Sequence, residues 1–170
     1  MSPTTLIAYA TKHDSTHQVA EMVAAVLRDD GLDADVRPAS SVDDVERYDG
    51  IVLGGALYAG RWHRDARHFL RDKREALAQR PVFVFGMGPL DLKEASVAGS
   101  RKQLDHALAK VPEVEPVAVA IFGGVVHQED QHFPFNHMPE SDARDPDAIR
   151  AWAREIAAVM KTPVVRLAHR

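Results

Sequence analysis

The amino-acid sequence predicts an open, mostly parallel, doubly wound α/β sheet. Short runs rich in β-branched and aromatic residues alternate with helical patterns along the chain. Most of these runs are continuously apolar, which is typical of strands that helices cover on both faces. Five strands and five helices interleave without an internal repeat, a low-complexity tract or a linker, so we expect a single domain over residues 1–170.

The five predicted strands are the runs at residues 6–10, 35–37, 51–53, 82–85 and 117–122. Helices are predicted where apolar residues recur at i, i+3, i+4 and i+7. The four long stripes lie at residues 19–27, 66–77, 104–111 and 149–160, and a pattern between Pro38 and Tyr48 indicates one short helix more. Gly31 is placed to end the first helix and Pro112 the third, while Asp145 and Pro146 are placed to open the last.

Composition narrows the possible functions. The formal net charge is -4 and the isoelectric point is near 6.1, so the chain lacks the excess of positive charge that nucleic-acid-binding proteins use. This argues against nucleic acid as a partner. Because cysteine is absent, disulfides and thiolate chemistry are excluded. The first residues lack the positive charge of a signal peptide, and no stretch has the length of a membrane span. We therefore expect a soluble, cytoplasmic protein.

A hydroxyl-rich loop joins the first strand to the first helix. The start of a helix offers unpaired N–H groups and a positive dipole end, and Thr11, Ser15 and Thr16 add side-chain donors, so this loop is a candidate phosphate site. Neither a P-loop nor a dinucleotide fingerprint is present. The alternative is a capping box formed by Ser15 and Gln18, which would start the helix without any ligand.

The loops after the third, fourth and fifth strands are rich in glycine. A doubly wound sheet binds its ligand at the carboxyl ends of the strands, where these loops begin. The loop after the third strand also carries Tyr58 and Trp62, two rings that the core pattern does not require. Each glycine is explained equally well by a turn, and each ring by packing. Taken together with the anion site, they predict a phosphorylated, planar aromatic cofactor.

Four motifs resemble those of flavodoxin-domain proteins, in the branch that includes menaquinone-dependent protoporphyrinogen dehydrogenase. Tyr-Ala-Thr-Lys-His-Asp-Ser-Thr at residues 9–16 is similar to the family's Tyr-x-Thr-Lys-x-Gly-Ser-Thr. Ala-Leu-Tyr-Ala-Gly-Arg-Trp at residues 56–62 is similar to Ile-Tyr-Ala-Gly-Lys-Trp, and Gly-Met-Gly-Pro at 86–89 and Phe-Gly-Gly at 122–124 follow. The resemblance continues at residues 142–145 and 148–150, so it covers essentially the whole chain.

The resemblance implies a five-stranded parallel sheet of order 2-1-3-4-5 with helices on both faces, and FMN as the cofactor. It assigns to the phosphate the residues Thr11, Lys12, His13, Ser15 and Thr16. It assigns to the isoalloxazine the residues Ala56, Leu57, Tyr58, Ala59, Gly60 and Trp62 on one side, and Gly86, Met87, Gly88 and Pro89 with Gly123 and Gly124 on the other.

Asp14 stands where the family usually has glycine. A carboxylate so close to a phosphate repels it unless the side chain turns outward or pairs, for which Lys12 and His13 are the nearest candidates. The backbone position itself is acceptable, because Asp tolerates the left-handed conformation better than most residues.

The segment at residues 125–144 is long for a strand-to-helix connection and contains His127, His132 and His137. We expect it to be a wall of the active site or a docking surface for a partner. The alternative is a polar loop held by a few aromatic residues. The histidine spacing of five and five matches no zinc pattern, so no metal site is predicted.

These observations favour an FMN-binding oxidoreductase that passes electrons or hydride to a quinone or another acceptor. The flavin performs the chemistry, and His127 and His63 are the candidates for handling protons. One alternative is a non-catalytic module in which Asp14 prevents the loop from binding phosphate. Another is a simple electron-transfer flavodoxin, which the weak net charge of -4 disfavours because it gives a poor steering field. The sequence leaves open the substrate, the electron donor and the oligomeric state.

Overall fold

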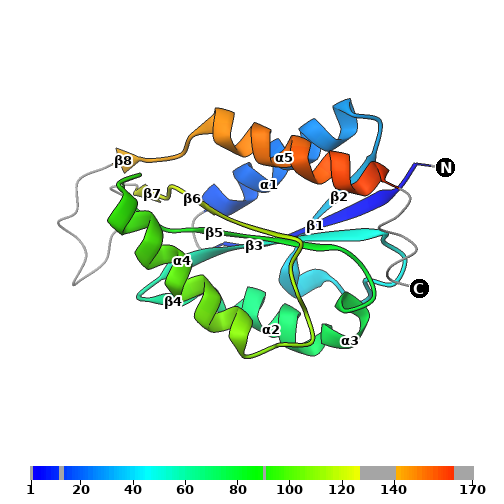
Figure 1. The fold of residues 1–170 in the computed structure, drawn as a ribbon, viewed down its shortest axis with the longest axis horizontal. Coiled ribbons are helices and arrows are strands. Elements are labelled where there is room, and N and C mark those ends of the chain that lie inside the picture. Colours follow the sequence, from blue (N-terminus) through cyan, green and yellow to red (C-terminus); the bar gives the residue numbers. More distant parts are fainter. Residues whose placement is uncertain (1, 12–13, 90, 127–140, 163–170) are drawn as a thin grey trace.

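The computed structural model describes residues 2–11, 14–89, 91–126 and 141–162. Its centre is a sheet of five parallel strands in the order β2-β1-β3-β5-β6 (Figure 1). The strands are β1 (Thr4–Ala10), β2 (Asp33–Pro38), β3 (Gly50–Tyr58), β5 (Val82–Met87) and β6 (Ala118–Phe122). Counted in chain order, this is the predicted arrangement 2-1-3-4-5, so the predicted fold class is confirmed.

Helices cover both faces of this sheet, as Figure 1 shows. One face carries α1 (Ser15–Asp29) and α5 (Pro146–Lys161), and the other carries α2 (Arg64–Asp72), α3 (Arg74–Leu77) and α4 (Glu94–Ala109). Successive strand residues point to opposite faces, so Leu6 packs in the core under α2 to α4 and Ile7 in the core under α1 and α5. In the second core, the Trp152 ring contacts Phe85 and Phe122 edge-on, with centroid separations of 5.9 and 5.5 Å.

The helix ends test the capping predictions. The Asp145 side chain accepts hydrogen bonds from the backbone N–H groups of Asp147 and Ala148 at 3.1 and 3.3 Å, so the predicted start of α5 is confirmed. At the end of α1, the N–H of Leu32 donates to the carbonyl of Leu27, and Gly31 has a φ of 85°. This Schellman motif confirms that Gly31 ends the helix.

The predicted capping box at the start of α1 is wrong. The helix begins at Ser15 itself, so Ser15 lies inside the first turn instead of before it. The N-cap is Asp14, whose φ of 69° is left-handed and whose side chain makes no capping hydrogen bond. A capping box requires an extended N-cap residue with its side chain turned onto the first turn, and neither condition is met here.

Two other helix predictions need correction. The stripe at residues 66–77 is divided between α2 and α3, which meet at Lys73, although Ala66, Phe69, Leu70 and Leu77 are all buried as the stripe requires. The short helix expected between Pro38 and Tyr48 is only a 3-10 turn, η1 (Ala39–Ser41). The pattern of apolar residues therefore predicted which positions are buried, but it did not predict where the helices end.

Three short strands were not predicted, because two residues are too few to show a periodicity. β4 (Arg61–Trp62) pairs antiparallel with the end of β3, and β7 (Val125–Val126) pairs with β8 (Ser141–Asp142). The turn between β3 and β4 has a left-handed backbone at both central residues, Ala59 (φ 50°) and Gly60 (φ 80°), as tight hairpins of the primed type require. Within the described ranges, the helices lack the length and apolar content needed to traverse a bilayer.

Candidate functional site

The structure brings the predicted loops together at the carboxyl edge of the sheet. Strand register places Ala10 beside Gly55, and Ala56 beside Met87. The loops after β5 and β6 are also joined, because the N–H of Gly124 donates to the carbonyl of Pro89 at 2.9 Å. The edge where β1, β3, β5 and β6 end is therefore the candidate site. Lys12, His13 and His127 lie outside the described residues, as do residues 128–140 of the long segment.

Two buried hydroxyl groups lie at the two ends of the loop that joins β1 to α1. The Oγ1 atoms of Thr11 and Thr16 are buried and have no hydrogen-bond partner among the described residues, and Thr16 as a whole is 0% exposed. Leaving a buried hydroxyl unpaired is unfavourable, so this pair is suited to a polar ligand. The backbone N–H groups of the same helical turn also lack an acceptor within the helix. A third unpaired hydroxyl, that of Thr5, lies further back along β1 and is not part of this loop.

The Asp14 carboxylate is paired with His17. Its Oδ1 atom lies 3.0 Å from Nδ1 of His17, and Nε2 of the same ring lies 3.1 Å from Oε1 of Glu21. The ring of His17 also stacks on Tyr9, with centroids 4.4 Å apart and planes 9° from parallel. Burial, together with the nearby carboxylates of Asp14 and Glu21, raises the pKa of the Tyr9 hydroxyl. Among the described residues, the partner of Asp14 is thus His17, one helical turn away. The adjacent Lys12 and His13, which the sequence suggested, lie outside the described residues.

The two aromatic residues of the β3–β4 hairpin have different environments. Tyr58 is 53% exposed at the end of β3. Trp62 is only 1% exposed, and its Nε1–H donates to the carbonyl of Gly55 at 3.1 Å. A Cβ on Gly55 would lie 2.6 Å from that same nitrogen, so the ring fits against bare backbone. Trp62 is therefore a core residue, and its expected place along a cofactor ring stays a prediction.

Packing between loops explains most of the glycines. A Cβ on Gly88 would lie 2.7 Å from the Cβ of Leu57, and one on Gly86 would lie 3.1 Å from a methyl group of the same side chain. At Gly123 the added atom would meet the carbonyl oxygen of Ala143 at 2.0 Å. Met87, between the first two, is buried in the core under α1 and α5. These positions shape the edge by letting its loops approach closely.

Comparison with known proteins agrees with this architecture. The model of the flavodoxin domain family matches residues 6–134 of the 170. This chain belongs to the flavodoxin domain family. Protoporphyrinogen IX dehydrogenase [quinone] of Escherichia coli strain K12 is 28% identical to this flavodoxin-domain protein, over 95% of its chain and 99% of the relative.

Solved flavodoxins share the fold. The flavodoxin of Streptococcus pneumoniae TIGR4 superposes with a TM-score of 0.57 at 22% identity, covering 91% of this chain and 98% of its own. The flavodoxin of Fusobacterium nucleatum, solved with flavin mononucleotide bound, gives a TM-score of 0.51 at 19% identity, covering 91% and 97%.

His63 has a structural role in this flavodoxin-domain protein. It is the N-cap of α2, and its Nδ1 atom accepts a hydrogen bond from the backbone N–H of Asp65 at 3.0 Å. An accepting nitrogen carries no proton, and burial lowers the pKa of the ring further. His63 thus caps the helix as a neutral imidazole, which gives no support to its expected role in proton handling.

The sequence reasoning missed Arg144 and His17. Arg144 forms a two-point ion pair with Asp142, at 3.0 and 2.7 Å, and also donates to the side chain of Gln18 on α1. It therefore ties the segment before α5 to the second turn of α1. The i, i+3 spacing of Asp14 and His17 could have indicated their pairing. Nothing in the sequence signals the contact between Arg144 and Gln18, which are 126 residues apart.

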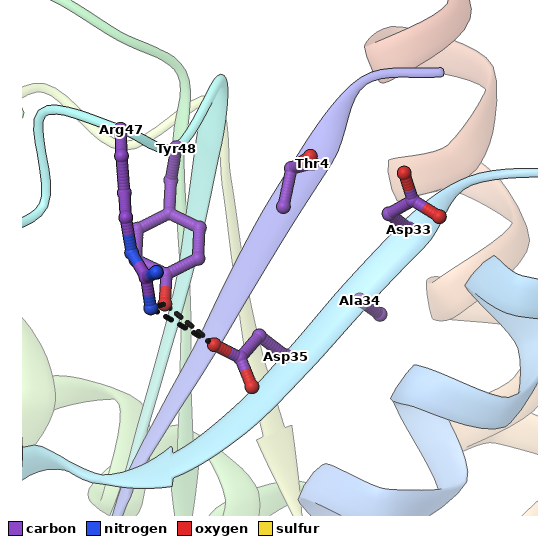
Figure 2. A pocket seen from close by; sticks show the side chains of 6 residues that line it. All are labelled: Thr4, Asp33, Ala34, Asp35, Arg47 and Tyr48. Carbon is purple, nitrogen blue, oxygen red and sulfur yellow. Dashed lines mark hydrogen bonds and ion pairs between the residues drawn. The ribbon is translucent and has the colours of Figure 1, made fainter. Parts of the chain in front are cut away.

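A hollow of about 430 Å³ lies at the opposite end of β1 and β2 (Figure 2). At its wall, Oδ2 of Asp35 accepts hydrogen bonds from the Tyr48 hydroxyl at 2.6 Å, from Arg37 at 2.8 Å and from Arg47 at 3.3 Å. The Tyr48 hydrogen bond is the main reason why the pKa of Asp35 is lowered. Because this network joins edge strand β2 to the loop before β3, we interpret it as a structural clamp.

Proposed function

We propose that this protein binds FMN at the edge where β1, β3 and β5 end, and passes electrons or hydride to a quinone or a similar acceptor. The observation that carries the proposal is the pair of buried hydroxyls of Thr11, directly after β1, and Thr16, in the first turn of α1, which have no partner among the described residues. A phosphate group is a strong acceptor for such hydroxyls and for the free N–H groups of a first helical turn. The residues present therefore fit the phosphate of FMN.

Two observations support a quinone or similar acceptor: the similarity to a named relative and the low net charge of the chain. The Escherichia coli relative, similar over nearly its whole length, carries a quinone in its name. A dedicated electron shuttle needs a strong field to steer it onto its partner, and a net charge of -4 over 170 residues supplies little. Bound FMN supplies the redox chemistry, so this chain has to bind and orient the flavin and to shape access to it.

The non-catalytic alternative rests on Asp14. Its carboxylate would repel a phosphate electrostatically if the side chain lay over the first turn of α1, where a capping side chain normally lies. That capping contact is absent, and the carboxylate is engaged by His17 instead. The proposed enzyme is therefore compatible with Asp14.

The test uses hydroxyl-deleting variants. Purified protein should be yellow, with the absorbance bands of oxidised flavin, and the flavin-free protein should bind added FMN. Thr16→Val removes one unpartnered hydroxyl and should weaken FMN binding about 10- to 100-fold, the value of a hydrogen bond to a charged group. Thr5→Val is the matched control, because its hydroxyl is also buried and unpartnered but lies back along β1.

Two outcomes would overturn the proposal. Protein that neither contains nor binds flavin has no FMN function. Equal FMN affinities for Thr16→Val and Thr5→Val would show that the hydroxyls at the start of α1 do not bind the phosphate. For the acceptor, the FMN-loaded protein should reduce menadione when given a chemical reductant of the flavin, and failure to do so would remove the quinone assignment while keeping the cofactor.

A further inference from the structure

The side chain of Arg144 connects the segment before α5 to the beginning of α1. Its Nε and Nη2 atoms donate to the two carboxylate oxygens of Asp142, at 3.0 and 2.7 Å, and its Nη1 atom donates to Oε1 of Gln18. The guanidinium is therefore held at three points, and the side chain is 21% exposed. A guanidinium suits this arrangement because its donors are coplanar and point in fixed directions.

The residue before it, Ala143, contacts the loops after β5 and β6. The N–H of Ala143 donates to the carbonyl of Gly124 at 3.0 Å, and the N–H of Gly124 donates to the carbonyl of Pro89 at 2.9 Å. A Cβ on Gly123 would lie 2.0 Å from the carbonyl oxygen of Ala143, so the two segments meet backbone to backbone. Residues 142–144 thus join the beginning of α1 to the loops on the other side of the candidate site.

The beginning of α1 lacks the usual side-chain cap. The side chain of the N-cap residue, Asp14, makes no capping hydrogen bond, so it does not fix the first turn. The contacts that hold this end from outside the helix include the stack of Tyr9 on His17 and the hydrogen bond from Arg144 to Gln18. The N–H of Gln18 donates to the carbonyl of Asp14 at 3.1 Å, so the contact with Arg144 holds the same turn that carries the free N–H groups.

We propose that Arg144 is a positioning residue for the phosphate of FMN, which acts by holding Gln18 and with it the first turn of α1. The inference rests on the proposed FMN function. The free N–H groups of that turn and the Thr16 hydroxyl bind the phosphate only at good distance and angle, so a turn that is free to shift loses affinity. Arg144 acts through Gln18, because Asp142 already engages its charge.

The measured quantity is the preference for FMN over riboflavin, which lacks the phosphate. Dissociation constants of the flavin-free protein for both flavins are measured by fluorescence quenching in one buffer. Arg144→Met removes the three donors, and Gln18→Met removes the acceptor on α1 while keeping Arg144 and its charge. The matched control is Lys161→Met, because Lys161 lies 4.0 Å from the carboxylate of Asp30 and so joins the same two helices at their other ends.

The preference for FMN should fall about three- to tenfold in Arg144→Met and by the same factor in Gln18→Met. The double variant should lower it no further, because both substitutions remove one contact. Riboflavin affinity in every variant, and the preference in Lys161→Met, should stay within about twofold of the wild type. The phosphorus NMR resonance of bound FMN should shift in Arg144→Met and Gln18→Met but not in Lys161→Met.

The proposal is overturned if Arg144→Met keeps the wild-type preference for FMN, or if Lys161→Met lowers the preference equally, since general packing of the two helices would then be responsible. It is also overturned if Gln18→Met has no effect or if the two effects add, because Arg144 would then act on the phosphate by its own charge.

Two further controls keep the test decisive. Gln18 is exposed on α1, so Gln18→Met tests the contact even if Arg144→Met fails to fold. Failure of the proposed FMN function is distinguishable, because the wild-type protein then binds neither flavin and shows no preference to change.

Discussion

Alanine substitutions of Trp62 and Tyr58, the two aromatic residues of the β3–β4 hairpin, should affect stability and FMN binding differently. Trp62→Ala removes a side chain that is 1% exposed and that donates to the carbonyl of Gly55. Truncating a buried Trp costs about 3–5 kcal/mol, and the unpaired carbonyl places the change at the upper end. For a chain of this size each kcal/mol shifts the melting temperature by about 2–4 °C, so Tm should fall by about 10–20 °C.

Tyr58→Ala should behave in the opposite way. The side chain is 53% exposed, so its removal should lower the free energy of unfolding by less than the removal of the buried Trp62 does. If it contacts the flavin ring, FMN should bind about 2- to 12-fold more weakly, which corresponds to a stacking contribution of about 0.5–1.5 kcal/mol.

Both variants are compared by urea and thermal unfolding of the flavin-free protein and by FMN titration. Flavin-free protein is needed because bound ligand raises Tm by mass action. The reasoning is refuted if Trp62→Ala unfolds at the wild-type midpoint, or if Tyr58→Ala is destabilised as strongly as Trp62→Ala.

Three further changes have defined outcomes. Asp14→Gly should tighten FMN binding about fivefold, measured by titration; equal affinity would mean that the carboxylate never faces the phosphate. Ala59→Asn should stabilise the protein by about 0.5–1 kcal/mol in urea unfolding, because Ala59 has a φ of 50°, and a loss of stability would contradict this. Tyr48→Phe should lose about 1 kcal/mol at pH 7 by deleting the hydrogen bond to Asp35. That bond lowers the pKa of Asp35, so its contribution is present at neutral pH and lost as the pH falls below about 4, where both proteins should converge.

The sequence by itself determined the architecture. Continuous apolar runs and helical stripes predicted five strands and the helices between them, and the sheet order 2-1-3-4-5 followed from the flavodoxin resemblance. The signals at Gly31, Asp145 and Pro146 also held, because capping is local chemistry between a side chain or a turn and the nearest backbone groups. The place of the candidate site followed in turn from the rule for carboxyl edges of parallel sheets.

Only the tertiary structure decided what individual site residues do. Tyr58 and Trp62 are both aromatic residues of one hairpin, and the core contacts of α2 and Gly55 determine that Trp62 is the buried one. Whether the hydroxyls of Thr11 and Thr16 find a hydrogen-bond partner likewise depends on the residues around them and not on the threonines themselves. Arg144 and Gln18 meet across 126 residues, because burial of α1 and α5 on one face of the sheet brings their ends together. Contacts of this range depend on the packing of whole elements, which no local pattern encodes.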